Sequence, residues 1–173
     1  MQLNGLIYVI PKEIKLLIAV FLVVINIGFF SSLLLVDNTT SMNTTGVQEN
    51  YLGNEADENA VEMKFQKTER EILGIVHTHI LSMSVLFFIM GIFVSITKLS
   101  NNLKLFLMLE PFLSVFLTFG GIYFLWMGIT WFKYIIIFSG SLMTLTFIIS
   151  TFIIFYQLIV TKSFKIIKIK KNK

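Results

Sequence analysis

Four long apolar runs, separated by polar stretches, dominate the pattern of hydrophobic positions along the chain. They cover approximately residues 16–36, 72–97, 103–127 and 134–160. Each run is long enough to cross the hydrocarbon core of a bilayer, which needs about 20 residues of helix. The two-residue alternation of an outer-membrane β-barrel is absent from all four runs. The pattern therefore predicts an all-α integral membrane protein, a four-transmembrane-helix bundle that forms one membrane domain over residues 1–173.

Composition excludes a water-soluble domain. Hydrophobic residues make up 55% of the chain and charged residues only 14%, and the mean hydropathy is +0.82. Lys12 and Lys15 precede the first run, as in a secretory signal, but the run is longer than a signal core and no small-x-small cleavage pattern occurs near Val36. We therefore interpret it as a retained anchor. Without cysteine, the chain forms neither a disulfide nor a thiolate metal site.

The charges are distributed unevenly between the two sides of a chain that crosses four times. Ten lysines fall on one side: Lys12, Lys15, Lys98, Lys104, Lys162, Lys165, Lys168, Lys170, Lys171 and Lys173. Eight of the ten acidic residues lie between Asp37 and Glu71. The positive-inside rule predicts cytoplasmic termini and an extracytoplasmic loop of 35 residues, 37–71. We interpret the basic cytoplasmic tail, residues 161–173, as a topology signal with some lipid adhesion, because nothing else supports nucleic-acid binding.

The predicted extracytoplasmic loop divides into two parts. Residues 37–46 are rich in Asn, Thr and Ser without periodicity, which predicts a flexible linker. Gly53 and Asn54 favour a turn. Thr68 with Glu71 forms a capping-box pattern, so the second membrane helix is expected to start near Glu69.

Two histidines, His77 and His79, lie inside the second apolar run, about 8–10 Å below its polar mouth. Ionisable side chains are rare in membrane helices and are functional candidates by default. Because residues two apart differ by about 200° around a helix, a regular helix cannot direct both imidazoles to one metal ion. His77 shares a stripe with small residues, which predicts an interior position. His79 shares its stripe with Met83 and Met90.

Three chemical interpretations of this pair stay open. In the first, His77, His79 and Met83 contribute to a haem or copper site, completed from another helix, a second copy or another protein. In the second, the histidines belong to a proton or ion pathway that continues through Asn26 and Glu110, beside the helix-disturbing Pro111. In the third, the imidazoles and a neutral Glu110 serve only structural hydrogen bonds.

Other motifs add little chemistry. Gly120-Gly121 and Ser139-Gly140-Ser141 predict close packing between the third and fourth membrane helices. The chain has no Walker A pattern, no G-x-S-x-G and no dense carboxylate cluster, so a stand-alone enzyme is disfavoured. No internal repeat of the kind that marks many secondary transporters is present.

Three segments carry a resemblance to a known group: Tyr51-Leu52-Gly53-Asn54-Glu55, Met63-Lys64-Phe65, and His77-Thr78-His79-Ile80-Leu81-Ser82-Met83. Over Tyr51 to Gly121 the chain resembles uncharacterised small four-span bacterial envelope proteins of Bacteroidetes type. The resemblance implies the four-span fold and a location in the bacterial cytoplasmic membrane. It also implies that Tyr51, Gly53, Asn54 and Glu55 fold over the histidines to form one extracytoplasmic site.

The function expected from these observations is that of a small inner-membrane accessory protein in an envelope or respiratory assembly. It contributes His77 and His79 to a haem or metal site, or to contacts within the assembly. The alternatives are a purely structural interaction subunit without a cofactor, and a small proton or ion pathway. The expected partners are the lipid bilayer and other membrane-protein subunits or further copies of this chain, with no nucleic acid.

Overall fold

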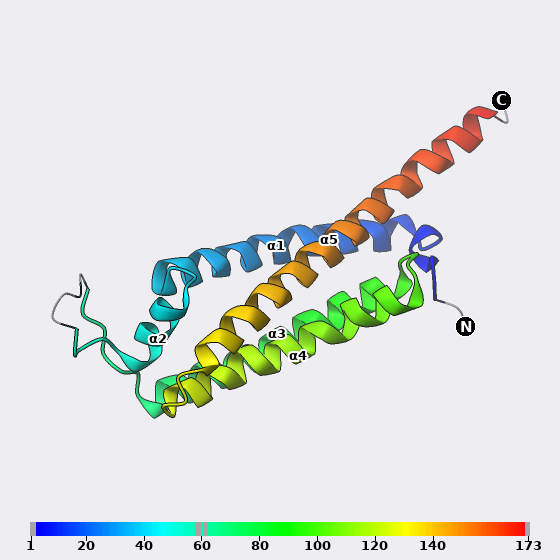
Figure 1. Cartoon of the computed structure of the whole chain (residues 1–173). Coiled ribbons are helices and arrows are strands. Elements are labelled where there is room, and N and C mark those ends of the chain that lie inside the picture. Colours follow the sequence, from blue (N-terminus) through cyan, green and yellow to red (C-terminus); the bar gives the residue numbers. More distant parts are fainter. Residues whose placement is uncertain (1–2, 58–59, 61, 172–173) are drawn as a thin grey trace.

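A computed structural model describes residues 3–57, 60 and 62–171, and side chains as far as residue 160. The described residues form a 3₁₀ turn, η1 (Leu6–Tyr8), and five α-helices, without a strand. The helices are α1 (Lys12–Thr40), α2 (Thr44–Leu52), α3 (Glu69–Ile96), α4 (Asn101–Trp126) and α5 (Phe132–Lys171). Four of them, all except α2, are long and apolar enough to cross a membrane. The predicted all-α, four-span fold class is confirmed (Figure 1).

Each observed membrane helix contains nearly all of its predicted apolar run. α3 begins at Glu69, as predicted, because Thr68 and Glu71 form a complete capping box. α1 extends beyond its apolar run at both ends, from Lys12 to Thr40. α5 is the longest helix, and it continues past the apolar run into the basic tail. The side chains of the tail, 161–173, lie outside the described residues.

The prediction of a flexible linker at residues 37–46 is wrong. α1 continues to Thr40, a tight turn follows in which Ser41 and Met42 have positive φ, and α2 begins within three residues. The Asn43 side chain accepts a hydrogen bond from Gly46 N at 2.8 Å, so the polar stretch caps a helix. A Cβ at Gly46 would lie 2.0 Å from the Thr40 carbonyl oxygen, so only glycine permits this close approach.

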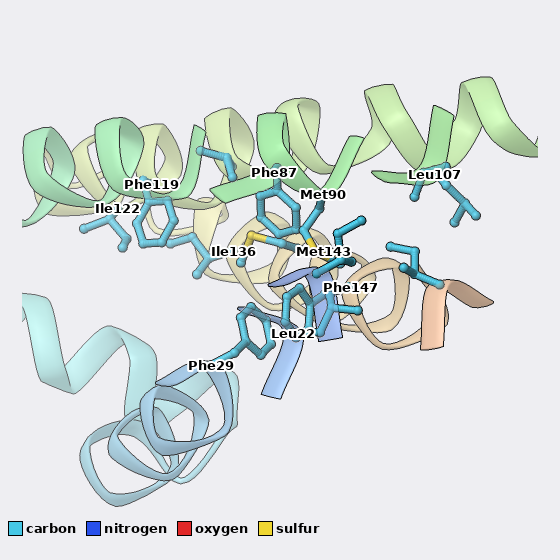
Figure 2. Close-up of a cluster of buried hydrophobic side chains, with 14 of the residues drawn as sticks. Leu22, Phe29, Phe87, Met90, Leu107, Phe119, Ile122, Ile136, Met143 and Phe147 are labelled. Atoms are coloured by element: carbon cyan, nitrogen blue, oxygen red, sulfur yellow. The ribbon is translucent and has the colours of Figure 1, made fainter. Parts of the chain in front are cut away.

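The core of the bundle lies where α4 packs between α3 and α5 and where α1 crosses α5. Phe147 on α5 is almost completely buried. Its ring stacks on Phe29 of α1, with centroids 4.0 Å apart, and meets Phe87 of α3 edge to face at 6.3 Å. Figure 2 shows these rings together with Met90 and Met143 in the space between the helices. One aromatic cluster thus joins three of the four membrane helices.

The α4–α5 contact is close where glycine faces it. A Cβ at Gly121 would lie 3.1 Å from Ile136 Cγ1, and a Cβ at Gly140 would lie 3.9 Å from Thr118. These positions agree with the predicted close packing of small residues between the third and fourth membrane helices.

The bundle has two ends of different construction. The N-terminal end holds residues 3–11 and the α3–α4 turn, where Gly5 N donates to Thr97 O at 3.2 Å. The Lys104 ammonium donates to the carbonyl oxygens of Ser95 and Thr97 at 2.8 and 2.9 Å. The opposite end, called here the α2 end, holds α2, residues 53–57, 60 and 62–68, and the α4–α5 turn. In Figure 1 the two chain termini lie toward the N-terminal end.

Candidate functional site at the α2 end

The segment after α2 folds into a compact turn around Asn54. The Asn54 side chain donates to Glu62 O at 3.0 Å and accepts from Lys64 N at 2.6 Å, while Asn54 N donates to Lys64 O at 2.9 Å. Lys67 N donates to Tyr51 O at 3.2 Å. Gly53 precedes this turn with φ near +80°, a conformation that glycine adopts without strain. The predicted turn at Gly53-Asn54 is confirmed.

Long-range hydrogen bonds fasten this turn to the membrane helices. Three side chains donate them: Lys64 Nζ to Thr39 O at 3.1 Å, Trp126 Nε1 to Lys67 O at 2.8 Å, and Lys133 Nζ to Gln48 Oε1 at 2.8 Å. Each bond joins elements that are distant in sequence, so α1, α2, α4 and α5 are held together at this end. We define the cap as residues 44–57, 60 and 62–67, together with these bonds.

Tyr51 is the aromatic anchor of the cap. It is largely covered and packs against the buried core. Burial raises the pKa of the Tyr51 hydroxyl to about 12, and a hydrogen bond with the Asn50 side chain offsets part of that rise. The phenol is therefore neutral at ordinary pH and acts as a packed side chain.

The structure places the two histidines on different faces of α3. His77 is exposed, so the prediction that it faces the bundle interior is wrong. The face that packs inward carries Phe87, Met90 and Val94. His79 is exposed as well, although its ring stacks on Phe119 of α4. The physical reason is that α4 packs along the face of these buried residues, which includes neither histidine, so both imidazoles stay exposed even though Gly91, on the stripe of His77, is buried.

His79 has a defined orientation. Its Nδ1 lies 2.8 Å from Ile75 O, and because a carbonyl only accepts, Nδ1 carries the proton. Its ring stacks on Phe119 of α4 with centroids 4.7 Å apart. In the neutral imidazole, Nε2 is then left with a lone pair that accepts a hydrogen bond or ligates a metal.

Both histidines lie below the expected membrane interface. Phe119 precedes Trp126 by seven residues on α4, which places it about 10 Å along the helix axis from that tryptophan. Tryptophan typically sits at the level of the lipid head groups. His79, stacked on Phe119, is therefore at membrane depth, and so is His77, two residues nearer the α2 end.

A shallow hollow of about 380 Å³ opens beside His79. It is lined by Lys67, Glu71, Gly74, Ile75, Thr78 and His79. Gly53 and Asn54 instead line a second hollow, of about 450 Å³, together with Lys133. Tyr51 is linked to the first hollow only through its backbone bond to Lys67, and Glu55 is exposed. None of the four loop residues Tyr51, Gly53, Asn54 and Glu55 is among the residues that line the His79 hollow.

The other candidate residues lie apart from the histidines. Met83 is half-buried and packs against the core, one turn below His79. Asn26 donates to Leu22 O of its own helix at 2.6 Å, and Glu110 accepts from Ser114 of its own helix. Each of these side chains is thus bonded within its own helix, and no hydrogen bond joins Asn26 to Glu110. Within the described residues, no three of His, Cys, Asp and Glu come together as metal ligands.

These features define a polytopic helical membrane protein whose four spans are closed at one end by a hydrogen-bonded cap. The chain belongs to the Aq_1264_TM family, described as a transmembrane helical domain, whose family model matches residues 41–165. The match runs from the turn just before the cap into the last part of α5. No curated protein and no solved structure matches this chain.

Proposed function

We propose that this protein is an accessory subunit that binds another membrane-spanning protein through the outer face of α3 at the level of His77. The observation that carries the proposal is the exposed imidazole at membrane depth. A polar side chain that faces lipid lacks hydrogen-bond partners, whereas a neighbouring helix can supply one. Interhelical hydrogen bonds of this kind are worth about 0.6–2 kcal/mol in membrane proteins.

The cap supports this interpretation because it fixes the geometry of the same end. The hydrogen bond from Trp126 to Lys67 O ties the end of α4 to the segment that leads into α3, so the helix that presents His77 has a fixed start. Thr78 is also exposed beside His77 and offers a second polar group. A partner helix therefore meets a preorganised polar surface, which reduces the entropic cost of binding.

A cofactor shared with that partner is the second candidate function. The specific observation in its favour is the hydrogen bond from His79 Nδ1 to Ile75 O, which leaves Nε2 as the ligating atom. Met83 follows one turn later and could add a thioether, a ligand found in cytochrome haems and Cu(I) sites. Since fewer than three ligand side chains come together in the described part of the chain, the partner would supply the remaining ligands of a haem or copper centre.

The same proposal includes the orientation of the chain in a bacterial cytoplasmic membrane. The lysines of the N-terminal end and the tail put both termini in the cytoplasm under the positive-inside rule, and the cap then lies outside. Because the chain has no cysteine, single cysteines report orientation without background. Met42→Cys, in the exposed turn before α2, should react with a membrane-impermeant thiol reagent on intact cells. Val9→Cys should react only after permeabilisation, and the reverse pattern would contradict this orientation.

The partner is tested by the native mass of the assembly extracted from its own membranes in mild detergent. Wild-type protein should elute as a complex larger than one chain with its detergent. His77→Leu should shift most of the protein to the single-chain mass, whereas Phe138→Leu, at another exposed position, should leave the complex intact. A wild-type protein that is already a single chain would overturn the proposal. An absorption spectrum and metal analysis of the same complex, with His79→Ala alongside, tests the shared cofactor.

A further inference from the structure

A row of buried polar side chains runs between α4 and α5. On α4 it contains Glu110, Ser114 and Thr118, which are spaced one helical turn apart. On α5 it contains Ser139, Thr146, Ser150 and Gln157, which share one face at spacings of seven, four and seven residues. All seven side chains are at least nine-tenths buried. We call this row the polar seam.

The two halves of the polar seam meet directly. The hydroxyl oxygens of Thr118 and Ser139 lie 2.7 Å apart, and Ser139 also donates to Ile135 O. This pair fixes the register of the antiparallel helices. Glu110 precedes Thr118 by eight residues on α4, and Phe147 follows Ser139 by eight residues on the antiparallel α5. Glu110 therefore lies at the level of Phe147, near the middle of the bundle.

Glu110 has one satisfied and one unsatisfied carboxyl oxygen. The Ser114 hydroxyl donates a short hydrogen bond to Oε1, whereas the buried Oε2 has no hydrogen-bond partner. The side chain is only 8% exposed. The next residue, Pro111, has no N–H, so the carbonyl of Leu107 lacks its helical donor. The unpartnered Glu110 Oε2 and the Leu107 carbonyl, which receives no hydrogen bond from Pro111, thus lie in the same turn of α4.

Nothing charged faces Glu110 from the helices packed around it. On α5, the described side chains between Lys133 and Val160 include no ionisable group except the tyrosines. α3 has none between His79 and Lys98, and α1 has none between Lys15 and Asp37. On α4 itself, Lys104 is engaged by the carbonyl oxygens of Ser95 and Thr97. An ionised Glu110 would be an uncompensated charge in hydrocarbon, which is strongly unfavourable.

We propose that Glu110 is an intramembrane binding site for one small monovalent cation, either a proton or an alkali-metal ion. In the proton-bound form, the carboxylate takes up H⁺ on Oε2 and becomes a neutral acid. Its O–H then donates to an acceptor in the same turn, for which the Leu107 carbonyl, which receives no hydrogen bond from Pro111, is the candidate. In the alkali-ion form, the carboxyl oxygens and the Ser114 hydroxyl serve as hard oxygen ligands. This site needs neither the histidines nor the partner of the proposed function.

The test is labelling of the purified full-length protein with dicyclohexylcarbodiimide, an apolar reagent that adds to protonated carboxyl groups in membrane interiors. The acid O–H adds across one carbodiimide C=N bond, and the adduct rearranges to a stable N-acylurea, so the mass rises by one reagent molecule. Wild-type protein should gain one adduct at Glu110. Glu110→Gln should gain none, and Glu13→Gln, which removes an exposed carboxyl, should label like wild type.

Two further measurements distinguish a bound proton from a bound alkali-metal ion and provide a result that does not depend on access of the reagent to Glu110. If sodium chloride protects Glu110 from labelling and an equal concentration of choline chloride does not, the ligand is an alkali-metal ion; if neither protects, it is the proton. Infrared absorption over a series of pH values reports the carbonyl stretch of a protonated acid without any reagent. The proposal is overturned if wild type and Glu110→Gln show the same labelling and the same infrared spectrum at every pH, with and without sodium.

Discussion

The N-termini of α3 and α4 differ in a way that a single substitution can measure. Thr68 and Glu71 exchange side-chain to backbone hydrogen bonds at the start of α3, with Thr68 N donating to Glu71 Oε2 at 2.8 Å. Ser100 occupies the same position before α4 but makes no capping hydrogen bond. The two residues are chemically similar, so they form a matched pair.

We predict that Thr68→Ala lowers the free energy of unfolding by about 1 kcal/mol, the usual contribution of an N-cap side chain. Ser100→Ala should change it by much less, because no side-chain bond is lost. Denaturant unfolding of both variants in the same detergent measures the difference. Equal losses in the two variants would show that the capping box contributes nothing to stability.

Tyr51 gives a prediction about alkaline pH. Because burial raises its pKa to about 12 in the folded protein, the unfolded phenol, with a pKa near 10, ionises first as the pH rises. The folded state keeps its proton between these values, so this group makes folding stability fall as the pH rises from about 10 to about 12. The midpoint temperature of thermal unfolding should fall more steeply over this pH range for wild type than for Tyr51→Phe. An equally steep fall in the two proteins would contradict the burial of the phenol.

For single residues, helix capping was predictable from the sequence, whereas the side of a helix that becomes buried was not. The capping box follows from four consecutive residues, and the structure confirms it at Thr68 and Glu71. Whether a histidine of α3 is covered depends on where α4 lies, and α4 is specified by residues far along the chain; both histidines are exposed. The small-residue stripe through His77 suggested an interior face, but the bulky Phe87 and Met90 mark the face that is actually covered.

At the scale of elements, two adjacent glycines on α4 separate backbone propensity from helix packing. A Cβ at Gly121 would lie 3.1 Å from Ile136 Cγ1 and 3.4 Å from Phe132 Cδ1, whereas a Cβ at Gly120 would meet nothing within 4 Å. Both substitutions to alanine gain the same helix propensity. Only one of them presses α4 away from α5.

We predict that Gly120→Ala stabilises the protein by up to about 1 kcal/mol, the propensity difference between glycine and alanine. Gly121→Ala should be less stable than Gly120→Ala by about 1–3 kcal/mol, the usual cost of overpacking. Unfolding of the two variants side by side measures this difference. A more stable Gly121→Ala would mean that α4 and α5 are not in close contact there.

The cap shows where sequence patterns stop being informative. The turn at Gly53-Asn54 is visible in the sequence, but the helix that precedes it was missed because an Asn/Thr-rich stretch resembles a linker. The bonds from Trp126 to Lys67 and from Lys133 to Gln48 join positions 59 and 85 residues apart. No local signal encodes such pairs, since one partner in the first is a backbone carbonyl and in the second an ordinary glutamine.

For the whole molecule, the arrangement of apolar surface determines how the bundle fits a membrane. Many large apolar side chains of the membrane helices are exposed, including Phe138 at 70%. That exposure is expected where lipid replaces water around the protein. The fold class was predictable because the membrane requirement acts on every long helix, whereas the polar seam was only partly visible, through Glu110 and Ser139. Burial of the remaining seam residues depends on how α4 and α5 pair.

Within this lipid-facing surface, His77 and Phe138 are both exposed and lie at nearly the same depth. The register of α4 and α5 places Phe138 at the level of Phe119, and Phe119 stacks on His79. One position carries a polar group that needs a partner, and the other carries an apolar group that suits lipid. A comparison of the two therefore distinguishes partner contact from simple exposure.

The measurement that tests the account most directly is photo-cross-linking from single cysteines in native membranes. His77→Cys and Phe138→Cys, each modified with a benzophenone maleimide in the otherwise cysteine-free chain, are irradiated and analysed by mass spectrometry. We predict one defined protein adduct from position 77, whether to a second copy or to another membrane protein, and only lipid adducts from position 138. Lipid adducts alone at both positions would contradict the claim that the outer face of α3 binds a partner.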